Sequence, residues 1–339
     1  MPDLHDQAIE LLSAYRLNEA DATCSRALRR CNDPLERANL TCTLAHIREA
    51  DSQAVSAKKL YQKVLQLLHR KHGVGIFRVK SWRGLGRIHR VAGDYQGAVG
   101  FLRLAVRQAE TLTDGRLELA DALGDLGVLY RYMGRLETSV ALYQRALEIC
   151  IAESGPRQPA VATFYHMLAG VNHVRGHLTE AETYGRQAVE IRSAALGPDH
   201  PDTVADAACL AAILIDTGGL DEAEAILKHA QKVFLKTYGS PHFELAVTLH
   251  NLASIANAKG DDRRAAKLFY QSLQMKEQLF GPTHPDLAMT LNNLAVLEQQ
   301  SGKEAKATAL GRRALAIAQA HLDPGHPSLE LIRGNWCEV

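Results

Sequence analysis

Four basic residues with helical spacing are the first feature of the sequence that could do chemistry. They follow one another at intervals of three or four: Lys80, Arg83, Arg87 and Arg90. A helix places such residues on one face, where unpaired like charges cost about 0.2–0.5 kcal/mol per pair. Arginine forks suit carboxylates, so the pattern favours an anion-binding surface. The alternative is an ordinary solvated face, paired with nearby acids such as Asp94 and Asp121.

Polar residues occupy the same face of the helices expected further along the chain. They begin with a cation and an aromatic ring, continue with histidines and end in amides: Arg131, Tyr132, His166, His173, His250, Asn251, Ser254, Asn257, Asn292, Asn293 and Gln299. Between the histidine and amide segments this face is apolar, at Ala205, Ala208, Ala212 and Ile215. Amides suit peptide backbone groups. Asparagine has poor helix propensity, so Asn251 and Asn293 need a compensating bond, either to a neighbouring repeat or to a ligand.

The histidines raise the question of a metal site. Four of them recur at one constant interval: His200, His242, His284 and His326. One repeat separates them by about 10 Å, whereas zinc ligands lie about 2 Å from the ion, so they cannot share a metal. We interpret them as helix-start residues. His166 and His173 are two helical turns apart, about 10 Å, and would need further ligands. The sequence predicts no metal and no cofactor.

Sequence signatures of enzymes are absent. The chain contains no GxGxxG after a strand, no GxxxxGK[ST], no HExxH and no GxSxG. Nothing assembles a nucleophile, a base and an oxyanion site, so we predict that the protein is not an enzyme. The net charge is +1 and aromatic residues make up 6%, which disfavours nucleic-acid binding, although the basic stripe from Lys80 to Arg131 keeps it as an alternative.

The composition is that of a folded chain of 339 residues, with 46% hydrophobic and 23% charged residues. The N-terminus lacks a basic segment followed by an apolar one, and no apolar run approaches the ~18 residues of a membrane span. We therefore expect a cytoplasmic protein without membrane partners. The six cysteines form no CxxC pair, which predicts reduced thiols.

Internal repeats dominate the sequence. Helical patterns end on glycine at Gly93, Gly134, Gly176, Gly218, Gly260 and Gly302, and the first step between these positions is one residue shorter than the other four, which are identical. Two less regular units come first, with turns expected near Tyr15 and Ser52.

Small residues align in three columns when the eight units are superposed. The first column lies seven residues before each turn: Ala8, Ala45, Gly86, Gly127, Ala169, Ala211, Ala253 and Ala295. The second lies five residues after it: Ala20, Ala57, Ala98, Ser139, Ala181, Ala223, Ala265 and Ala307. The third is Ala27, Val64, Ala105, Ala146, Ala188, Ala230, Ser272 and Ala314. Small side chains let two helices approach closely, so each unit is expected to be a tightly packed helical pair.

These columns and turn glycines resemble the tetratricopeptide repeat, and Trp82 matches the aromatic residue of its first helix. The 42-residue period, the GxxHPD linkers at 197–202 and 281–286, and the segment Leu291–Ala295 look like the kinesin light chain type of repeat. The resemblance covers about residues 4 to 320. It implies an all-α fold, a right-handed superhelical α-solenoid of about eight hairpins, whose first helices line a concave groove.

The predicted boundaries follow from the repeats. A single solenoid covers 1–325, and its approximate units are 1–31, 35–69, 76–109, 117–151, 159–193, 201–235, 243–277 and 285–319. A C-terminal capping segment and tail covers 326–339, and a short helix from Pro327 to Trp336 is expected to cover the end of the solenoid.

The preferred function is a non-catalytic adaptor or receptor that holds an extended, acidic peptide segment of a partner protein in the groove. Carboxylates would lie near Arg83, Arg87 and Arg90, and the asparagines would bond the peptide backbone. The alternative is a structural scaffold that self-associates through its terminal repeats.

Overall fold

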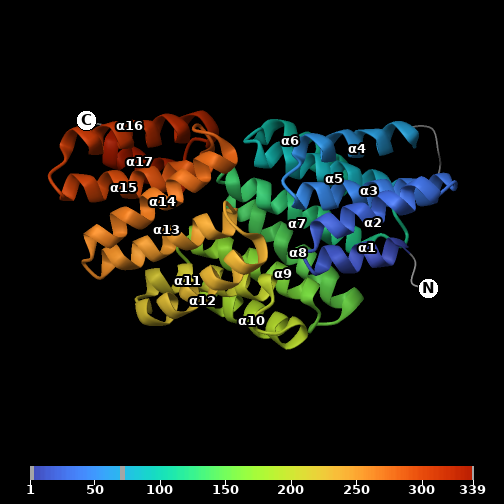
Figure 1. The fold of residues 1–339 in the computed structure, drawn as a ribbon, viewed down its shortest axis with the longest axis horizontal. Coiled ribbons are helices and arrows are strands. Elements are labelled where there is room, and N and C mark those ends of the chain that lie inside the picture. Colours follow the sequence, from blue (N-terminus) through green and yellow to red (C-terminus); the bar gives the residue numbers. More distant parts are fainter. Residues whose placement is uncertain (1–3, 69–72, 338–339) are drawn as a thin grey trace. The chain divides into compact units, whose positions relative to one another are not determined.

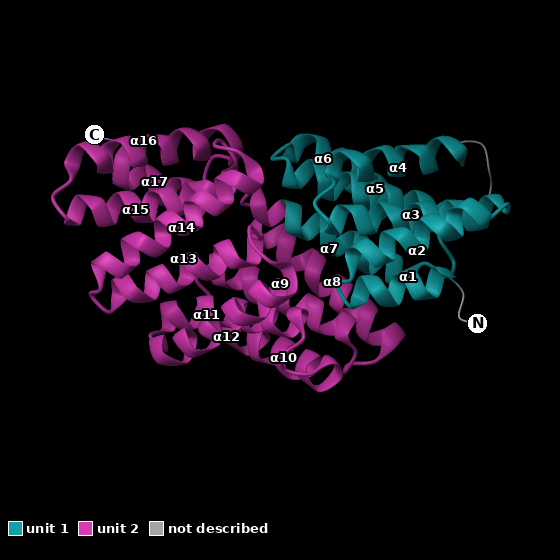
Figure 2. Cartoon of the chain, in the orientation of Figure 1, with its two compact units in different colours: residues 1–129 teal, residues 130–339 magenta. Residues whose placement is uncertain are grey.

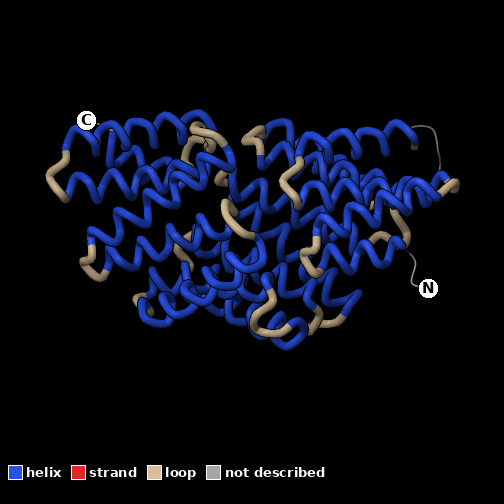
Figure 3. The backbone as a smooth tube through the Cα atoms, viewed as in Figure 1, coloured by secondary structure: helices blue, strands red, loops and turns tan. Residues whose placement is uncertain are grey.

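The computed structural model describes residues 4–68 and 73–337, and within these ranges every regular element is a helix (Figure 3). The predicted all-α fold is confirmed. Parts of the predicted segments fall on residues 1–3, 69–72 and 338–339, which lie outside this description. Over the described ranges, no helix is long and apolar enough to cross a membrane.

The helices form successive pairs along the chain (Figure 1). Their bounds are α1 Leu4–Ser13, α2 Leu17–Arg30, α3 Pro34–Ala50, α4 Ala54–Leu67, α5 Gly75–Val91, α6 Tyr95–Ala109, α7 Arg116–Tyr132, α8 Leu136–Ser154, α9 Pro159–Val174, α10 Leu178–Leu196, α11 Pro201–Thr217, α12 Leu220–Tyr238, α13 Phe243–Ala258, α14 Asp262–Phe280, the short η1 Pro285–Leu287, α15 Ala288–Gln300, α16 Glu304–His321 and α17 Pro327–Trp336. We call the odd-numbered helices from α1 to α15 the A helices and their even-numbered partners the B helices.

The chain divides into two compact units, residues 1–129 and 130–339 (Figure 2). Unit 1 contains α1 to α6 and most of α7. Unit 2 contains the end of α7 and the helices from α8 to α17. Within each unit A helices pack on their own B helices, as α5 does on α6 and α13 on α14, and B helices pack on a following A helix, as α4 does on α5 and α12 on α13, which is the arrangement of an α-solenoid. The single solenoid predicted over 1–325 stays a prediction.

The three columns of small residues lie in the interior of the helical packing. All twenty-four are buried, and the most exposed alanine among them, Ala27, is only 8% accessible. At Gly86 a Cβ atom would lie 2.5 Å from the Leu102 side chain on the partner helix. The helices approach so closely here that even a methyl group would force Leu102 to move. The packing reason inferred from the sequence is confirmed for the hairpin of α5 and α6.

The turns between paired helices need a left-handed residue. The six turn glycines have φ between 74° and 87°. The first two hairpins place Tyr15 and Ser52 in the same conformation, with φ of 56° and 59°. Side chains are disfavoured at such φ values, so these two turns keep the geometry of the repeat at a cost that glycine avoids.

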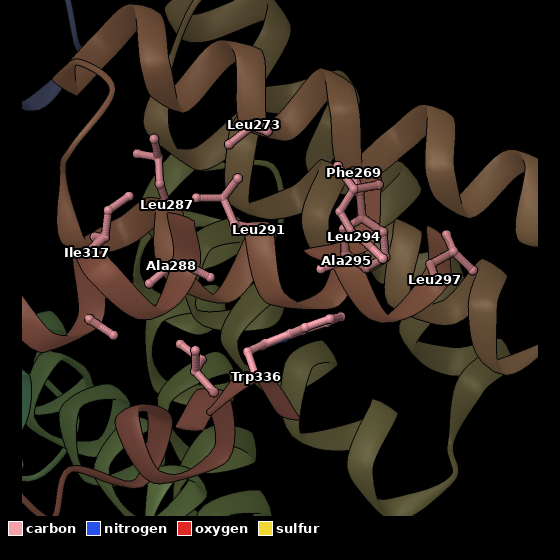
Figure 4. Close-up of a cluster of buried hydrophobic side chains, with 14 of the residues drawn as sticks. Phe269, Leu273, Leu287, Ala288, Leu291, Leu294, Ala295, Leu297, Ile317 and Trp336 are labelled. Carbon is pink, nitrogen blue, oxygen red and sulfur yellow. The ribbon is translucent and has the colours of Figure 1, made fainter. Parts of the chain in front are cut away.

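The short helix α17 covers the last hairpin. Trp336 is 2% exposed and lies against α15 beside Leu294 and Ala295 (Figure 4). A Cβ atom added at Gly311 on α16 would overlap the Trp336 ring, so glycine makes room for the indole. The expected C-terminal cap is confirmed, and it supplies the apolar surface that a further hairpin would otherwise provide.

Candidate functional site

The basic face of α5 forms ion pairs with the neighbouring A helices of unit 1. Arg83 Nε donates to Asp125 Oδ2 at 2.7 Å, and its Nη1 donates to Asp121 at 2.7 Å. Arg87 donates two hydrogen bonds to the Glu49 carboxylate, at 2.7 and 2.8 Å, and a third to Asp125 at 3.2 Å. The two arginines therefore join α5 to α3 on one side and to α7 on the other.

Opposite charges in this group outweigh the effect of burial on the pKa values. Burial acts to raise the pKa of Asp125, but Arg83 and Arg87 hold it below its usual range. The pKa of Glu49 is likewise lowered by Arg87 despite burial. Because the charges compensate one another, the group joins neighbouring A helices and has little capacity for an external carboxylate.

The other members of the basic face lie at its two ends. Asp121 is a partner, as the solvated-face alternative allowed, whereas Asp94 instead lies 2.7 Å from the His89 ring. Lys80 and Arg90 are half-buried. The proposed anion site is therefore internally paired at its centre, which the residues of α5 alone did not indicate.

Arg131, at the end of α7 in unit 2, has different surroundings. No carboxylate of the described residues lies within ion-pair distance of its guanidinium, which stands 5.2 Å from the centre of the Tyr132 ring. Burial opposes its charge, yet its pKa is raised by its electrostatic neighbours Tyr132, Tyr143, Cys209 and Asp286. Cys209 belongs to α11 and Asp286 to η1, so segments of three separate hairpins come near this half-buried cation.

The two histidines of α9 each contact an acid on α11. His166 Nδ1 lies 2.9 Å from Asp206 Oδ1, and His173 Nε2 lies 2.6 Å from Asp216 Oδ2. Asp206 is 3% exposed and also accepts from Arg192 Nε at 2.6 Å. The histidines have separate partners, so they do not converge on one ligand.

One residue of the predicted contact surface is buried. Asn292 is 2% exposed, and its Oδ1 accepts from Trp336 Nε1 at 3.0 Å and from Asn335 Nδ2 at 3.0 Å. This corrects the prediction that Asn292 faces a peptide. The reason is the cap, since α17 lies over the side of α15 on which Asn292 stands.

The remaining amides and hydroxyls are accessible to different degrees. Asn293 is half-buried on α15, and its Nδ2 lies 3.5 Å from His250 Nε2 on α13. Asn293 thus has a partner in the neighbouring repeat. Ser254 donates to the His250 carbonyl at 3.2 Å. Asn251 is half-buried, and Asn257 and Gln299 are exposed.

The four histidines that recur once per repeat each cap the start of a helix. Nδ1 accepts from the backbone N–H two residues later, at 3.2 Å for His200, 3.3 Å for His242, 3.2 Å for His284 and 3.1 Å for His326. The helix-start interpretation is confirmed. In the part of the chain that the structure describes, no three His, Cys, Asp or Glu side chains are grouped as metal ligands.

The sequence reasoning did not identify the acids and bases that pair across repeats. These residues are Glu49, Asp125, Arg192 and Asp206. A usable signal was present, because Asp125 follows Arg83 by one full repeat period and so occupies the same place in the next unit. Comparing each charged residue with its repeat equivalent, and not only with its own helix, would have indicated this pair.

Comparisons with known proteins agree with this architecture. A family model described as tetratricopeptide repeat matches residues 118–194, 203–278 and 265–320. The curated protein KINESIN LIGHT CHAIN-RELATED 3 of Arabidopsis thaliana is 28% identical over 158 residues, which make up 45% of this chain and 23% of that protein. The match therefore spans less than a quarter of the relative.

Two solved structures share the fold over nearly the whole chain. A Rap protein complexed with Competence and Sporulation Factor has a TM-score of 0.65 and 14% identity, covering 99% of this chain and 96% of its own. Aspartyl phosphate phosphatase F from Bacillus subtilis has a TM-score of 0.61 and 12% identity, covering 93% of each chain. At these identities the likeness concerns the fold alone.

Proposed function

The chain belongs to the tetratricopeptide repeat family, with repeats of the kinesin light chain type, and on that premise we propose that its A helices bind an extended peptide segment bearing acidic side chains. Repeats of this family mediate contacts between proteins, and the chain is a protein–protein interaction adaptor in this general sense. What we propose beyond this is that the bound segment is acidic, and which residues hold it.

The proposal rests on the surroundings of the Arg131 guanidinium. A half-buried guanidinium normally has a carboxylate partner, as Arg83 and Arg87 do, because an uncompensated charge is costly away from water. Among the described residues Arg131 has no carboxylate within ion-pair distance: the Tyr132 ring lies 5.2 Å away, and Asp286 acts on its charge only from further off. A carboxylate of the bound segment would supply the missing charge and a forked hydrogen-bond acceptor.

Donors on further A helices of unit 2 extend this surface. Asn251 on α13 and Asn293 on α15 are half-buried with amide groups suited to a peptide backbone. His250 lies beside Asn293. A segment held at Arg131 by a side chain and at the amides by its backbone would be bound in extended form, since the donors lie on separate hairpins.

The test begins by selecting ligands from a displayed library of random twelve-residue peptides. Selected sequences should be enriched in Asp and Glu. Fluorescence anisotropy of a labelled selected peptide should then show at least about tenfold weaker binding to Arg131→Gln, which is the loss expected from removing one partly buried charged bond of about 1.4 kcal/mol or more.

Arg186→Gln is the matched control, because Arg186 lies on the exposed side of α10 and pairs with Glu182 and Glu222. It should bind within about twofold of the unchanged protein. Selection without acidic enrichment, or equal affinity of the Arg131 variant, would refute the proposal. Light-scattering mass across a dilution series separates peptide binding from self-assembly, because a stable monomer that binds peptide excludes a scaffold role at those concentrations.

A further inference from the structure

The B helices of unit 1 carry an excess of positive charge that the net charge of the chain conceals. Helices α2, α4 and α6 contain two acids and eight lysines and arginines, which are Arg26, Arg29, Arg30, Lys58, Lys59, Lys63, Arg103 and Arg107. The B helices of unit 2, from α8 to α16, contain twelve acids and thirteen lysines and arginines, so they are nearly neutral. The excess is therefore local to one set of helices.

Both acids of these three helices have cationic partners. Glu19 pairs with Arg16, and Asp21 Oδ2 lies 2.8 Å from Arg48 Nε. Helices α4 and α6 contain no acid. Among the described residues, no carboxylate lies within ion-pair distance of six exposed cations: Arg26, Arg29, Arg30, Lys59, Lys63 and Arg107. These side chains are accessible to an anion outside the chain.

Exposed aliphatic side chains lie among these cations. Four residues at intervals of four form one continuous stripe along α4: Val55, Lys59, Lys63 and Leu67. Its two aliphatic ends are strongly exposed, Val55 at 73% and Leu67 at 51%. On α6, Leu104 is 43% exposed and precedes Arg107 by one helical turn. Both helices therefore present aliphatic groups and cations to the same side.

The repeat architecture joins the two helices into one surface. Figure 1 shows α4 and α6 on the same side of α3 and α5. Lys63 and Leu104 each directly precede a residue of the third small column, so stacking places them at equivalent positions on successive B helices. Arg26 occupies that position on α2. We call the surface formed by Val55, Lys59, Lys63, Leu67, Leu104 and Arg107 the B-helix face.

Cations mixed with exposed aliphatic groups match the chemistry of an anionic lipid bilayer. Lysine and arginine are attracted to its headgroups, and aliphatic side chains enter the boundary of the acyl region. A nucleic acid would use the cations but leave Val55 and Leu67 without apolar contacts. Its single strands also stack on aromatic rings, whereas Tyr61 and Tyr95 of these helices are buried. An acidic helix of a protein binds in a groove, from which Val55 instead protrudes.

We infer that the B-helix face docks unit 1 on an anionic lipid bilayer, with its cations against the headgroups and its aliphatic side chains at the acyl boundary. The sequence expectation of no membrane partner rested on the lack of a long apolar run, which a surface contact does not need. The inference goes beyond the proposed peptide binding, because the B-helix face contains no residue of the A helices.

Co-sedimentation with large unilamellar vesicles tests the inference on the full chain. Vesicles of phosphatidylcholine with about 30 mol% phosphatidylserine should bind the protein at least about tenfold more strongly than vesicles of phosphatidylcholine alone. Binding should weaken as sodium chloride rises from about 50 to 300 mM, because salt screens the attraction between the cations and the headgroups.

Charge reversal at Lys59 and Lys63 identifies the surface that binds. Each cation near an anionic bilayer strengthens binding about fivefold, so Lys59→Glu with Lys63→Glu should weaken it at least about tenfold. Lys232→Glu with Lys236→Glu is the matched control, since these lysines are also exposed and four residues apart on a B helix, α12. The control changes the net charge equally and should weaken binding less than about threefold.

A tryptophan at position 55 reports entry into the acyl boundary. The emission of Val55→Trp should shift to shorter wavelength on the phosphatidylserine vesicles, because the indole leaves water. Leu235→Trp is the control, at a position of α12 where the leucine is 54% exposed. Its emission should not shift.

Equal binding to both kinds of vesicle, or an equal loss in the Lys232 and Lys236 variant, would overturn the inference. An unshifted emission of Val55→Trp on bound protein would overturn the aliphatic contact. Binding to poly-glutamate or to duplex DNA without binding to the vesicles would assign the B-helix face to another kind of partner and also overturn it. Circular dichroism of each variant checks that the exposed substitutions leave the fold intact.

Discussion

Arg83 and Asp125 stand one repeat period apart in the sequence and form an ion pair of 2.7 Å between two A helices, with side chains 17% and 14% exposed. The same carboxylate also meets Arg87 at 3.2 Å. Replacing Arg83 or Arg87 by an acid would place a new carboxylate next to Asp125. A loss of peptide binding in such a variant would therefore not distinguish a lost binding residue from weakened packing between the A helices. Arg131 is the better position for a binding test, because in the described part of the chain no ion pair depends on it.

Asp125→Asn should destabilise unit 1 by about 3 kcal/mol, since two partly buried arginines lose the charge that balances them. Asp121→Asn is the control, because Asp121 is 54% exposed and, among the described residues, pairs with Arg83 alone. Its expected cost is below about 1 kcal/mol. Urea unfolding followed by circular dichroism measures both, and equal costs would contradict the role assigned to Asp125.

Ser52→Gly should stabilise the protein by about 0.5–1 kcal/mol, because Ser52 has a φ of 59° that glycine adopts without strain. The gain should appear as a higher melting temperature. Gln62→Gly, at an exposed position inside α4, should instead cost about 1 kcal/mol. A loss of stability in both variants would show that Ser52 is not strained.

His242 should make stability depend on pH. Burial lowers its pKa to about 4, so between about pH 4 and 6.5 the unfolded chain binds a proton that the folded chain does not. This contribution is fully present above about pH 6.5 and is lost as the pH falls toward 4. Because solvent partly screens the ring, we expect a loss of about 1–2 kcal/mol at pH 5.

Two substitutions separate the titration of His242 from its capping bond to Glu244 N–H. His242→Asn caps a helix without titrating, so it should reduce the loss of stability between pH 7.5 and 5 while keeping the stability at pH 7.5. His242→Gln should reduce the loss equally but start from a lower stability. Unchanged slopes in urea titrations of both variants would rule out His242 as the source.

Trp336→Ala should cost about 3–5 kcal/mol, because it removes a buried ring from the contact between α17 and the last hairpin. Trp336→Phe should cost about 1–2 kcal/mol, since it keeps most of the apolar contact and loses the bond to Asn292. Leu331 is 51% exposed on α17, so Leu331→Ala should change stability by less than about 0.5 kcal/mol. Thermal unfolding distinguishes the three, and similar values for Trp336→Ala and Leu331→Ala would contradict the capping role.

Much of the fold could be predicted from the sequence, because the residues that indicate it lie within one repeat. The turn glycine Gly260 and the small residues Ala253 and Ala265 belong to the two helices of one hairpin. They lie close to one another in the sequence. The histidine caps are local in the same way, since His284 bonds two residues ahead. Such short-range geometry follows from residue type and spacing.

The candidate site could be predicted only in part, because its charged side chains pair with side chains of neighbouring repeats. The periodicity of α5 placed Arg83 and Arg87 on one face, but a helical pattern carries no information on what a neighbouring hairpin sets against that face. Asn292 likewise fits the pattern of an accessible residue until α17 covers it.

The sequence by itself therefore determined the repeat, its hairpins, its caps and the faces of its helices. Only the tertiary structure decided which charges are paired, as at Arg87 and Glu49, and which have no paired carboxylate among the described residues, as at Arg131 and Lys276. The physical reason is that an ion pair forms within about 4 Å, and those distances arise between elements of successive repeats only when the hairpins are stacked.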